Sequence, residues 1–246
     1  MRREELALAK WLAVMVVMLS RAWAAAPSTP PVYNAKPFDA LLRANVHDGR
    51  PDVAALKGSA ALAACLDHLA HAAEPTTAAE REAYGLNAYN ALCLATLTEH
   101  WPATSAVAID GFFDRLEHTL SERTTTLDAL ENDKLRPIGD PRVHCALYLG
   151  ARGGAALRAE AYDPERLEVQ LEEQAKAWVN DRRNVRYDAA NHLLLTSLLF
   201  RWYAVDFEAL GGPAGFATKY LADPAVKTQL AAGSYGIVTL PFDWSL

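Results

Sequence analysis

The sequence predicts an α+β fold, a single and mainly helical domain with a small antiparallel sheet. Two observations predict it. Apolar residues recur at helical spacing through most of the chain, and two short runs near the C-terminal end, 185–188 and 193–198, flank a turn-like Ala-Ala-Asn-His. The chain has 246 residues, of which 51% are hydrophobic, so it is long enough to bury a substantial core.

The first 24 residues are predicted to be a secretory signal peptide. A basic start precedes an unbroken apolar run from Trp11 to Leu19, and Ala22-Trp23-Ala24 has the small-x-small pattern of a cleavage site. The apolar run is shorter than the ~20 residues of a membrane-spanning helix. We therefore expect an exported protein, periplasmic or secreted, with no membrane span after signal removal; retention as an uncleaved anchor is the alternative. Residues 25–37 are proline-rich and predict a linker to a globular domain at 38–246.

The stretch from Ala83 to Trp101 is predicted to be the helix around which the fold is built. Thr77 and Glu80 form a capping box before it, and Pro102 ends it. It is apolar on nearly every side, which is typical of a buried helix, yet it carries Asn87 and Asn90. Because a buried amide without partners costs about 1–3 kcal/mol, these two side chains must find hydrogen bonds.

The other elements follow from caps, prolines and glycines. Residues 107–113 fit either a strand and turn or a short helix, and residues 142–149, which follow Asp140-Pro141, fit a helix or a buried strand. The remaining expected elements are helices at 38–46, 53–73 with a possible break at Gly58-Ser59, 127–135, 165–178, 200–210, 213–221 and 224–232, an extended segment at 124–126, a loop at 150–156 and a strand at 236–240.

Five ordered runs of residues resemble the family of domains of unknown function numbered 547, over about residues 35–246. The resemblance implies no established activity. The chain departs from the pattern after the histidine, where the family has a loop with cysteine, serine and a Cys-Pro-Pro-like end, and here the corresponding positions are Leu149, Ala151, Gly154, Ala155 and Ala156. The runs that carry the resemblance are Asn87–Leu92, Leu127–Glu131 with Leu135-Arg136, Asp140–His144 with Ala146-Leu147, Phe200–Phe207 and Phe242–Leu246.

Composition excludes some classes of function. The net charge is −6 and no Lys/Arg run exceeds two residues, so we expect no nucleic-acid partner. Cys65, Cys93 and Cys145 show no metal-ligand spacing, and Cys65 and Cys93 lie in apolar helical patterns that suit buried hydrophobic residues. His68 and His71 belong to no larger set of ligands. We therefore expect no metal site and no cofactor.

His144 is the candidate general base, with Glu131 to orient it and Asn90 to polarise a carbonyl. The alternative is that both nitrogens of His144 are bonded inside the protein and that the residue joins two segments of the fold. Asn87, Arg142 and Arg152 are candidate ligand-binding residues, Arg152 because it lies in a glycine-rich loop that could hold an anion. Asp206 is expected to be a structural partner of an arginine or a backbone N–H.

Two functions follow from these residues. The first is a non-catalytic member of its family that binds an unknown small molecule or protein, or has a structural role, because the loop that could supply a nucleophile has lost its cysteines. The second is a hydrolase or acyl-transfer enzyme with a His-Glu-Asn site. An open pocket at His144 favours the enzyme, and a sealed, fully bonded histidine favours the non-catalytic domain.

Overall fold

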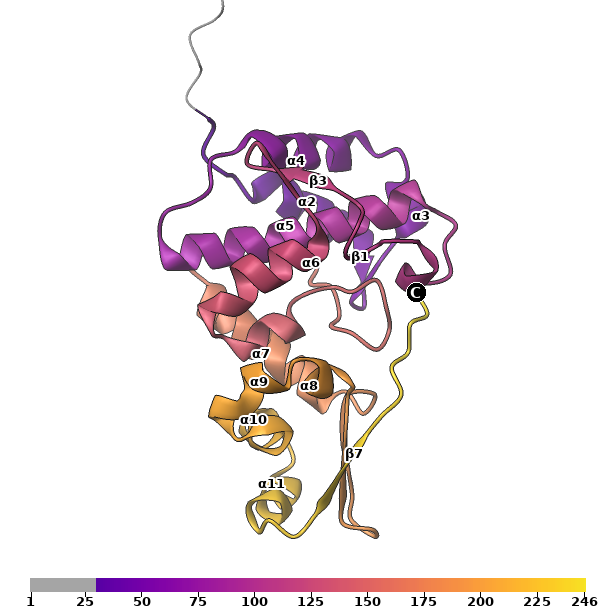
Figure 1. Ribbon diagram of the computed structural model, residues 1–246, viewed down its shortest axis with the longest axis vertical. Coiled ribbons are helices and arrows are strands. Elements are labelled where there is room, and N and C mark those ends of the chain that lie inside the picture. Colours follow the sequence, from indigo (N-terminus) through magenta and orange to yellow (C-terminus); the bar gives the residue numbers. More distant parts are fainter. Residues whose placement is uncertain (1–29) are drawn as a thin grey trace, which may run out of the picture. The chain divides into compact units, whose positions relative to one another are not determined.

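A long buried helix, α5 (Ala78–Glu99), runs through the helical part of the fold (Figure 1). It begins with the predicted capping box, in which Thr77 Oγ1 accepts from the backbone N–H of Glu80 and the Glu80 carboxylate accepts from the backbone N–H of Thr77. Every residue from 82 to 98 is buried. The helix is therefore surrounded by other elements on all sides, as its apolar sequence predicts.

The computed structural model describes residues 30–246, and Val32–Leu246 form one compact unit. The predicted signal peptide and the first residues of the predicted linker lie outside the described part. Within the described part of the predicted linker, Val32 pairs with Ala73 through a single β-bridge. None of the helices in the described range is long and apolar enough to cross a membrane.

Short helices pack beside α5. The predicted break at Gly58-Ser59 is present, and Ser59 caps the following helix by accepting from the backbone N–H of Leu62. Gly58 has a φ of +71°, a left-handed conformation that glycine adopts without strain. The elements of this region are α2 (Lys36–Asn45), β1 (Val46–His47), β2 (Arg50–Pro51), α3 (Val53–Leu56) and α4 (Ala60–His71).

The middle of the chain is less regular than its sequence suggests. The helix predicted at 127–135 begins as α6 (Leu127–Leu130) but continues as a wider π-helical turn, η2 (Glu131–Leu135). The predicted 142–149 segment is neither an α-helix nor a strand, because only a 3₁₀ helix, η4 (Pro141–Cys145), follows the Asp140 cap. The other elements here are η1 (Ala106–Ala108), β3 (His118–Leu120), β4 (Arg123–Thr125) and η3 (Arg136–Ile138).

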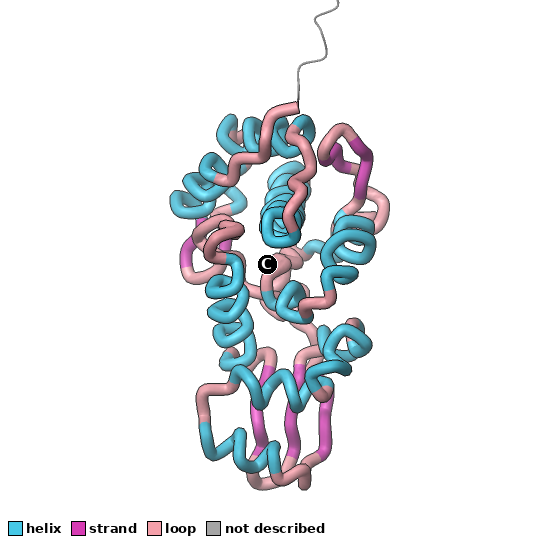
Figure 2. Tube along the Cα trace, turned by 90° about the vertical axis from the view of Figure 1, so that its left-hand side faces the viewer, coloured by secondary structure: helices cyan, strands magenta, loops and turns pink. Residues whose placement is uncertain are grey.

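The C-terminal part holds a three-stranded sheet and the helices beside it (Figure 2). The predicted antiparallel hairpin is present, with Val185 paired to Thr196 and Asp188 to Leu193. The last strand adds parallel to the hairpin's second arm, so this sheet is mixed and not purely antiparallel. The elements are α7 (Leu167–Asn180), β5 (Val185–Asp188), β6 (Leu193–Thr196), α8 (Leu199–Trp202), α9 (Ala204–Phe207), η5 (Glu208–Leu210), α10 (Gly212–Tyr220), α11 (Pro224–Ala231) and β7 (Gly236–Thr239).

After β7 the chain leaves the sheet and returns to the helical part, where its last described residues lie near α3 (Figure 1). Ser245 pairs with Ser105 in a β-bridge. The returning segment thus ties the sheet region to the residues that follow α5.

Candidate functional site

Both asparagines of α5 hydrogen-bond the backbone of an irregular segment. Asn90 donates from Nδ2 to the carbonyl of Ala146 at 3.1 Å and accepts from the N–H of Tyr148 at 2.8 Å. Asn87 donates to the carbonyl of Tyr162 and accepts from its N–H, both at 2.8 Å. A side-chain amide bonded in this way replaces a neighbouring strand for the backbone it contacts. Neither amide is therefore free to bind a ligand or to polarise a substrate carbonyl.

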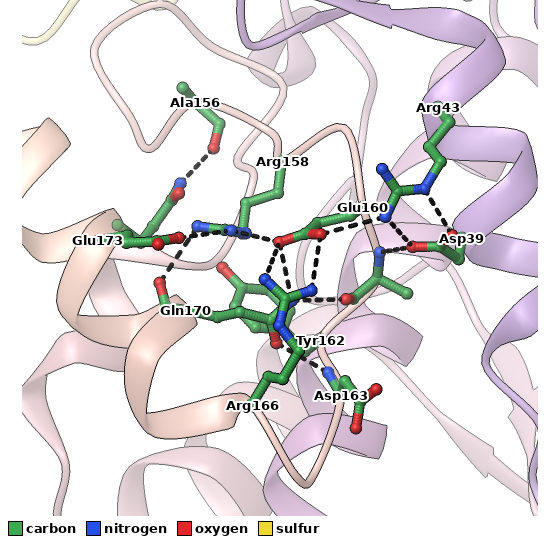
Figure 3. Close-up of polar contacts among 12 residues, drawn as sticks. Asp39, Arg43, Ala156, Arg158, Glu160, Tyr162, Asp163, Arg166, Gln170 and Glu173 are labelled. Carbon is green, nitrogen blue, oxygen red and sulfur yellow. Dashed lines mark hydrogen bonds and ion pairs between the residues drawn. The ribbon is translucent and has the colours of Figure 1, made fainter.

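The segment held by these amides, residues 146–163, is called the buried loop here because most of its residues are buried although it has no regular structure. Helix α7 supplies more of its partners (Figure 3). Gln170 donates to the carbonyl of Ala161 at 2.9 Å, and Gln174 donates to that of Ala156 at 2.6 Å. Because a buried backbone group without a partner costs stability, a buried loop needs such side chains, and α5 and α7 provide them.

A carboxylate fastens the end of the buried loop. Glu160 accepts from Arg158, and from Arg166, Gln170 and Arg43 at 3.1 Å each, so it joins the loop to α7 and α2 (Figure 3). Burial alone would raise the pKa of Glu160, but the hydrogen bonds from Arg158, Gln170 and Arg166 lower it to about 2. Protein side chains therefore occupy the hydrogen-bonding positions of the Glu160 carboxylate, which leaves it no role in binding a ligand.

His144 lies in η4 with its side chain only 1% exposed. Its Nε2 is 2.7 Å from an Asp206 carboxylate oxygen, and its Nδ1 is 3.4 Å from Oε1 of Glu131. Tyr203 stacks on the imidazole with ring centroids 3.9 Å apart, and Phe207 lies 5.6 Å away. Both ring nitrogens therefore face carboxylates of the protein, and an aromatic ring covers one face.

Asp206 also binds Arg136, which donates to its two oxygens at 2.7 and 3.0 Å. Burial would raise the pKa of Asp206, but the hydrogen bonds from Arg136 and His144 hold it below its ordinary value. An ionised carboxylate only accepts, so His144 Nε2 carries the proton of the bond between them. Burial, followed by the charge of Glu131, raises the pKa of Tyr203. We call these five residues, His144, Glu131, Asp206, Arg136 and Tyr203, the histidine cluster.

The structure thus brings two of the three candidate catalytic residues together, His144 and Glu131, and gives Asn90 backbone partners instead. None of these three lines any of four cavities found among residues 30–246. Cys145, next to the histidine, is fully buried, and burial raises the pKa of its thiol well above the ordinary value. A thiol of that kind is a poor nucleophile at neutral pH.

Arg142 lies in a separate group of charges. It binds Asp140 and donates to both oxygens of Glu168 at 2.6 and 2.7 Å, and its side chain is 11% exposed. The guanidinium is therefore occupied by protein carboxylates rather than open to a ligand. Glu82 lies nearby on α5, and its Oε1 has no hydrogen-bond partner among the described residues. Burial, and then the charge of Asp140, raises the pKa of Glu82 to about 7.

The glycine-rich loop uses its N–H groups for the returning C-terminal segment. Arg152 N donates to the carbonyl of Ser245 and Gly153 N to that of Asp243, each at 2.8 Å. A Cβ at Gly153 would lie 2.8 Å from the backbone nitrogen of Asp243, so only glycine allows this approach. These N–H groups are not available to cradle an anion. The Arg152 side chain does line a cavity.

That cavity, of about 370 Å³, lies between the β1–β2 turn, the buried loop and α7, and is called the loop cavity. Four of the five positions that depart from the family pattern line it, and Leu149 is the exception. Among its described lining residues there is no Cys, Ser, Thr, His or Lys. Its lining includes aromatic, charged and amide side chains and one alanine of α7: Arg50, Trp101, Tyr148, Arg152, Ala177, Trp178, Asp181, Arg183 and Asn184.

A larger cavity, of about 610 Å³, lies beside the N-terminal half of α5 and the β3–β4 turn. Two pairs of its polar side chains are bonded to one another. Tyr84 and Ser121 share a hydrogen bond of 2.8 Å, and Lys134 binds Glu74 at 3.1 Å. The loop cavity differs in that Trp178 Nε1 and Asn184 Oδ1 are buried without a partner among the described residues.

Within the described range there is no group of three or more His, Cys, Asp or Glu side chains that could hold a metal ion. Cys65, Cys93 and Cys145 are buried and unpaired with one another. His68, considered above as a metal ligand, accepts a hydrogen bond at Nε2 from the backbone N–H of Asn34 at 2.9 Å.

Sequence reasoning missed several residues that matter in the structure. Asp206 was expected to bind an arginine, which it does, but its bond to His144 joins residues 62 positions apart and no local pattern indicates it. Trp178 ends the helix predicted at 165–178, and nothing in that helical pattern indicates a cavity. Asn184, directly before a predicted strand, was not singled out. A signal was available there, because a buried amide at a strand end needs partners.

Comparison with known proteins supports the resemblance over part of the chain. Residues 73–179 match the family described as "Protein of unknown function, DUF547". The matched range includes α5, the π-helical turn, His144, the buried loop and most of α7. The resemblance is thereby confirmed for this range. No curated protein and no solved structure matches the chain.

Proposed function

We propose that this chain is an exported, non-catalytic ligand-binding domain and that its ligand binds in the loop cavity. The observation that carries the proposal is the chemistry of that cavity. Small, unreactive residues occupy positions at which the family resemblance leads one to expect cysteine and serine, and no described lining residue is a Cys, Ser, Thr, Lys or His. The cavity keeps an apolar wall and several polar side chains, which suits binding.

The histidine cluster supports the non-catalytic part of the proposal. A catalytic base must reach a proton of the substrate, directly or through one water. His144 is 1% exposed, and both of its nitrogens face carboxylates. Its neighbours join η4, the π-helical turn and α9, so the cluster acts as a clamp between segments that are distant in the sequence.

The binding part of the proposal is tested with matched tryptophan substitutions on α7. Ala177 is exposed and lines the loop cavity, so Ala177→Trp is expected to fill the cavity without disturbing the core. Val169 is 55% exposed on the same helix and lines none of the four cavities, so Val169→Trp is the control. In a thermal-shift screen of neutral, acidic and basic fragments, hits on the native protein should vanish in the first variant and persist in the second. Hits that persist in both place binding elsewhere and contradict the proposal.

The non-catalytic part is tested with 4-nitrophenyl esters and peptide anilides. We expect no turnover that depends on His144. Turnover by the native protein that is lost in a folded His144→Phe variant would establish the enzyme alternative. For export, mass spectrometry of the mature protein should show an N-terminus at Ala25, and an intact Met1 would overturn that part of the proposal.

A further inference from the structure

The charges around the loop cavity balance. Three aspartates and three arginines line it. Arg183 is bound to Asp181, and Arg152 donates to the carbonyl of Leu246 at 3.0 Å. An anionic or cationic ligand would therefore be repelled by as many side chains as attract it. A neutral polar ligand would not meet this charge repulsion. The cavity therefore offers no net charge that would attract an anion or a cation, and a neutral ligand fits it.

Two residues that line the cavity each hold a buried polar atom without a partner among the described residues, one a donor and one an acceptor. The indole N–H of Trp178 is the donor, and this residue is 3% exposed. The acceptor is Oδ1 of Asn184, which is 2% exposed. The amide orientation of Asn184 is set by its Nδ2, which donates to the carbonyl of Trp178 at 3.1 Å. Each unsatisfied buried group costs about 1–3 kcal/mol, so a ligand that bonds both gains more than at an exposed site.

A hydroxyl group suits such a pair, because it donates and accepts at the same time. The rim of the cavity adds planar carboxylate, guanidinium and amide groups, which can hold two adjacent hydroxyls. Trp101, which is partly exposed, supplies apolar surface with a polar end, whereas Tyr148 and Trp178 line the cavity but are only 6% and 3% exposed. The C–H faces of a sugar ring pack on such surfaces. The volume of about 370 Å³ falls in the range of roughly 300–1,000 Å³ of small-molecule sites.

From this arrangement, and resting on the proposed function above, we infer that the loop cavity binds a neutral saccharide of one or two rings, with hydroxyls on Trp178 Nε1 and Asn184 Oδ1. Neither atom is reached by solvent in the structure. Binding therefore includes a small movement of these two side chains toward the sugar. The movement changes the environment of the indole, which makes the tryptophan emission a direct readout.

The test titrates the full chain with neutral sugars and with charged analogues of the same size. The neutral probes are glucose, galactose, N-acetylglucosamine, maltose and cellobiose, and the charged probes are glucuronate, glucose 6-phosphate and glucosamine. Calorimetry gives the affinity, and tryptophan fluorescence reports whether the environment of an indole changes on binding. Binding of at least one neutral sugar, with a change in emission and with weaker binding of its charged analogue, supports the inference.

Trp178→Phe keeps an aromatic ring and removes the N–H donor. We expect it to weaken the neutral sugar about tenfold, which corresponds to a hydrogen bond of about 1.4 kcal/mol. Trp202→Phe is the control, because Trp202 is 44% exposed and lies outside the loop cavity. Equal affinity in both variants contradicts the placement of the sugar.

The outcomes separate this inference from the proposed function. If only a charged analogue binds, and Ala177→Trp abolishes that binding, the ligand class is wrong and the binding domain stands. If no probe sugar binds while fragments that depend on Ala177 do, the inference is also wrong and the proposed function again stands. If neither sugars nor fragments bind in the cavity, both fail.

Discussion

Replacement of His144 by alanine should destabilise the protein strongly. The substitution removes the bond to Asp206 at 2.7 Å, the contact with Glu131 at 3.4 Å and the stacking on Tyr203 at 3.9 Å. Asp206 keeps Arg136, but Glu131, whose side chain is 5% exposed, loses the imidazole that faces it. Loss of one partner of a buried polar pair costs about 3–5 kcal/mol, and the lost aromatic stacking adds to this. We therefore expect a loss of about 4 kcal/mol in the free energy of unfolding.

For a domain of this size, 1 kcal/mol corresponds to about 2–4 °C, so the melting temperature should fall by about 10 °C. Circular dichroism and urea unfolding measure the change. His144→Phe, which retains a stacking ring, should lose about 2–3 kcal/mol because only the polar contacts disappear. His47→Ala, an exposed site in β1, is the control and should change by less than about 0.5 kcal/mol. A melting temperature that is the same for His144→Ala and His47→Ala would refute the clamp.

Three more predictions follow from buried groups. Asn90→Ala leaves two backbone groups of the buried loop without partners and should cost about 2–4 kcal/mol in urea unfolding, and a cost below about 0.5 kcal/mol would show that the loop does not depend on this amide. The pKa of Glu82 is about 7 in the fold against 4.5 ordinarily, so its carboxyl destabilises the fold as the pH rises through this window. Glu82→Gln should therefore raise stability by about 2 kcal/mol at pH 8, allowing for screening, and change it little at pH 4; an equal gain at both values would exclude this titration. Gly153→Ala places a Cβ against the backbone of Asp243, so hydrogen exchange of residues 241–246 should rise, and unchanged protection would mean that the segment tolerates a side chain.

Much of the fold was predictable because local chemistry determines it. The capping box at Thr77, the break at Gly58-Ser59 and the hairpin at 185–196 each rest on residues close together in the chain. The parallel pairing of β7 with β6 was not predictable, because it joins residues about 40 positions apart and no turn sets its direction. The 3₁₀ helix η4 carries a correct start signal, but the backbone that follows is bonded by side chains of other elements and not by a continuing helix.

The candidate site was predictable in its residue types and not in its contacts. That Asn87 and Asn90 need partners follows from an apolar helix, but the identity of those partners depends on how the buried loop folds back. His144 and Glu131 were paired from their order in the chain, and the structure places them 3.4 Å apart. Trp178 Nε1 and Asn184 Oδ1 lack hydrogen-bond partners because of the tertiary packing around them, and the hydrophobic periodicity of the sequence does not indicate this.

His144 is sealed between two carboxylates, with its side chain 1% exposed. Diethylpyrocarbonate modification of the native protein, followed by mass spectrometry of each histidine, tests whether solvent reaches this imidazole. His47 is exposed and should react at once, whereas His144, at 1% exposure, should react only as fast as the protein unfolds. Reaction of His144 at the rate of His47 in the folded protein would mean that the imidazole is open to substrates and that it is not a buried structural clamp.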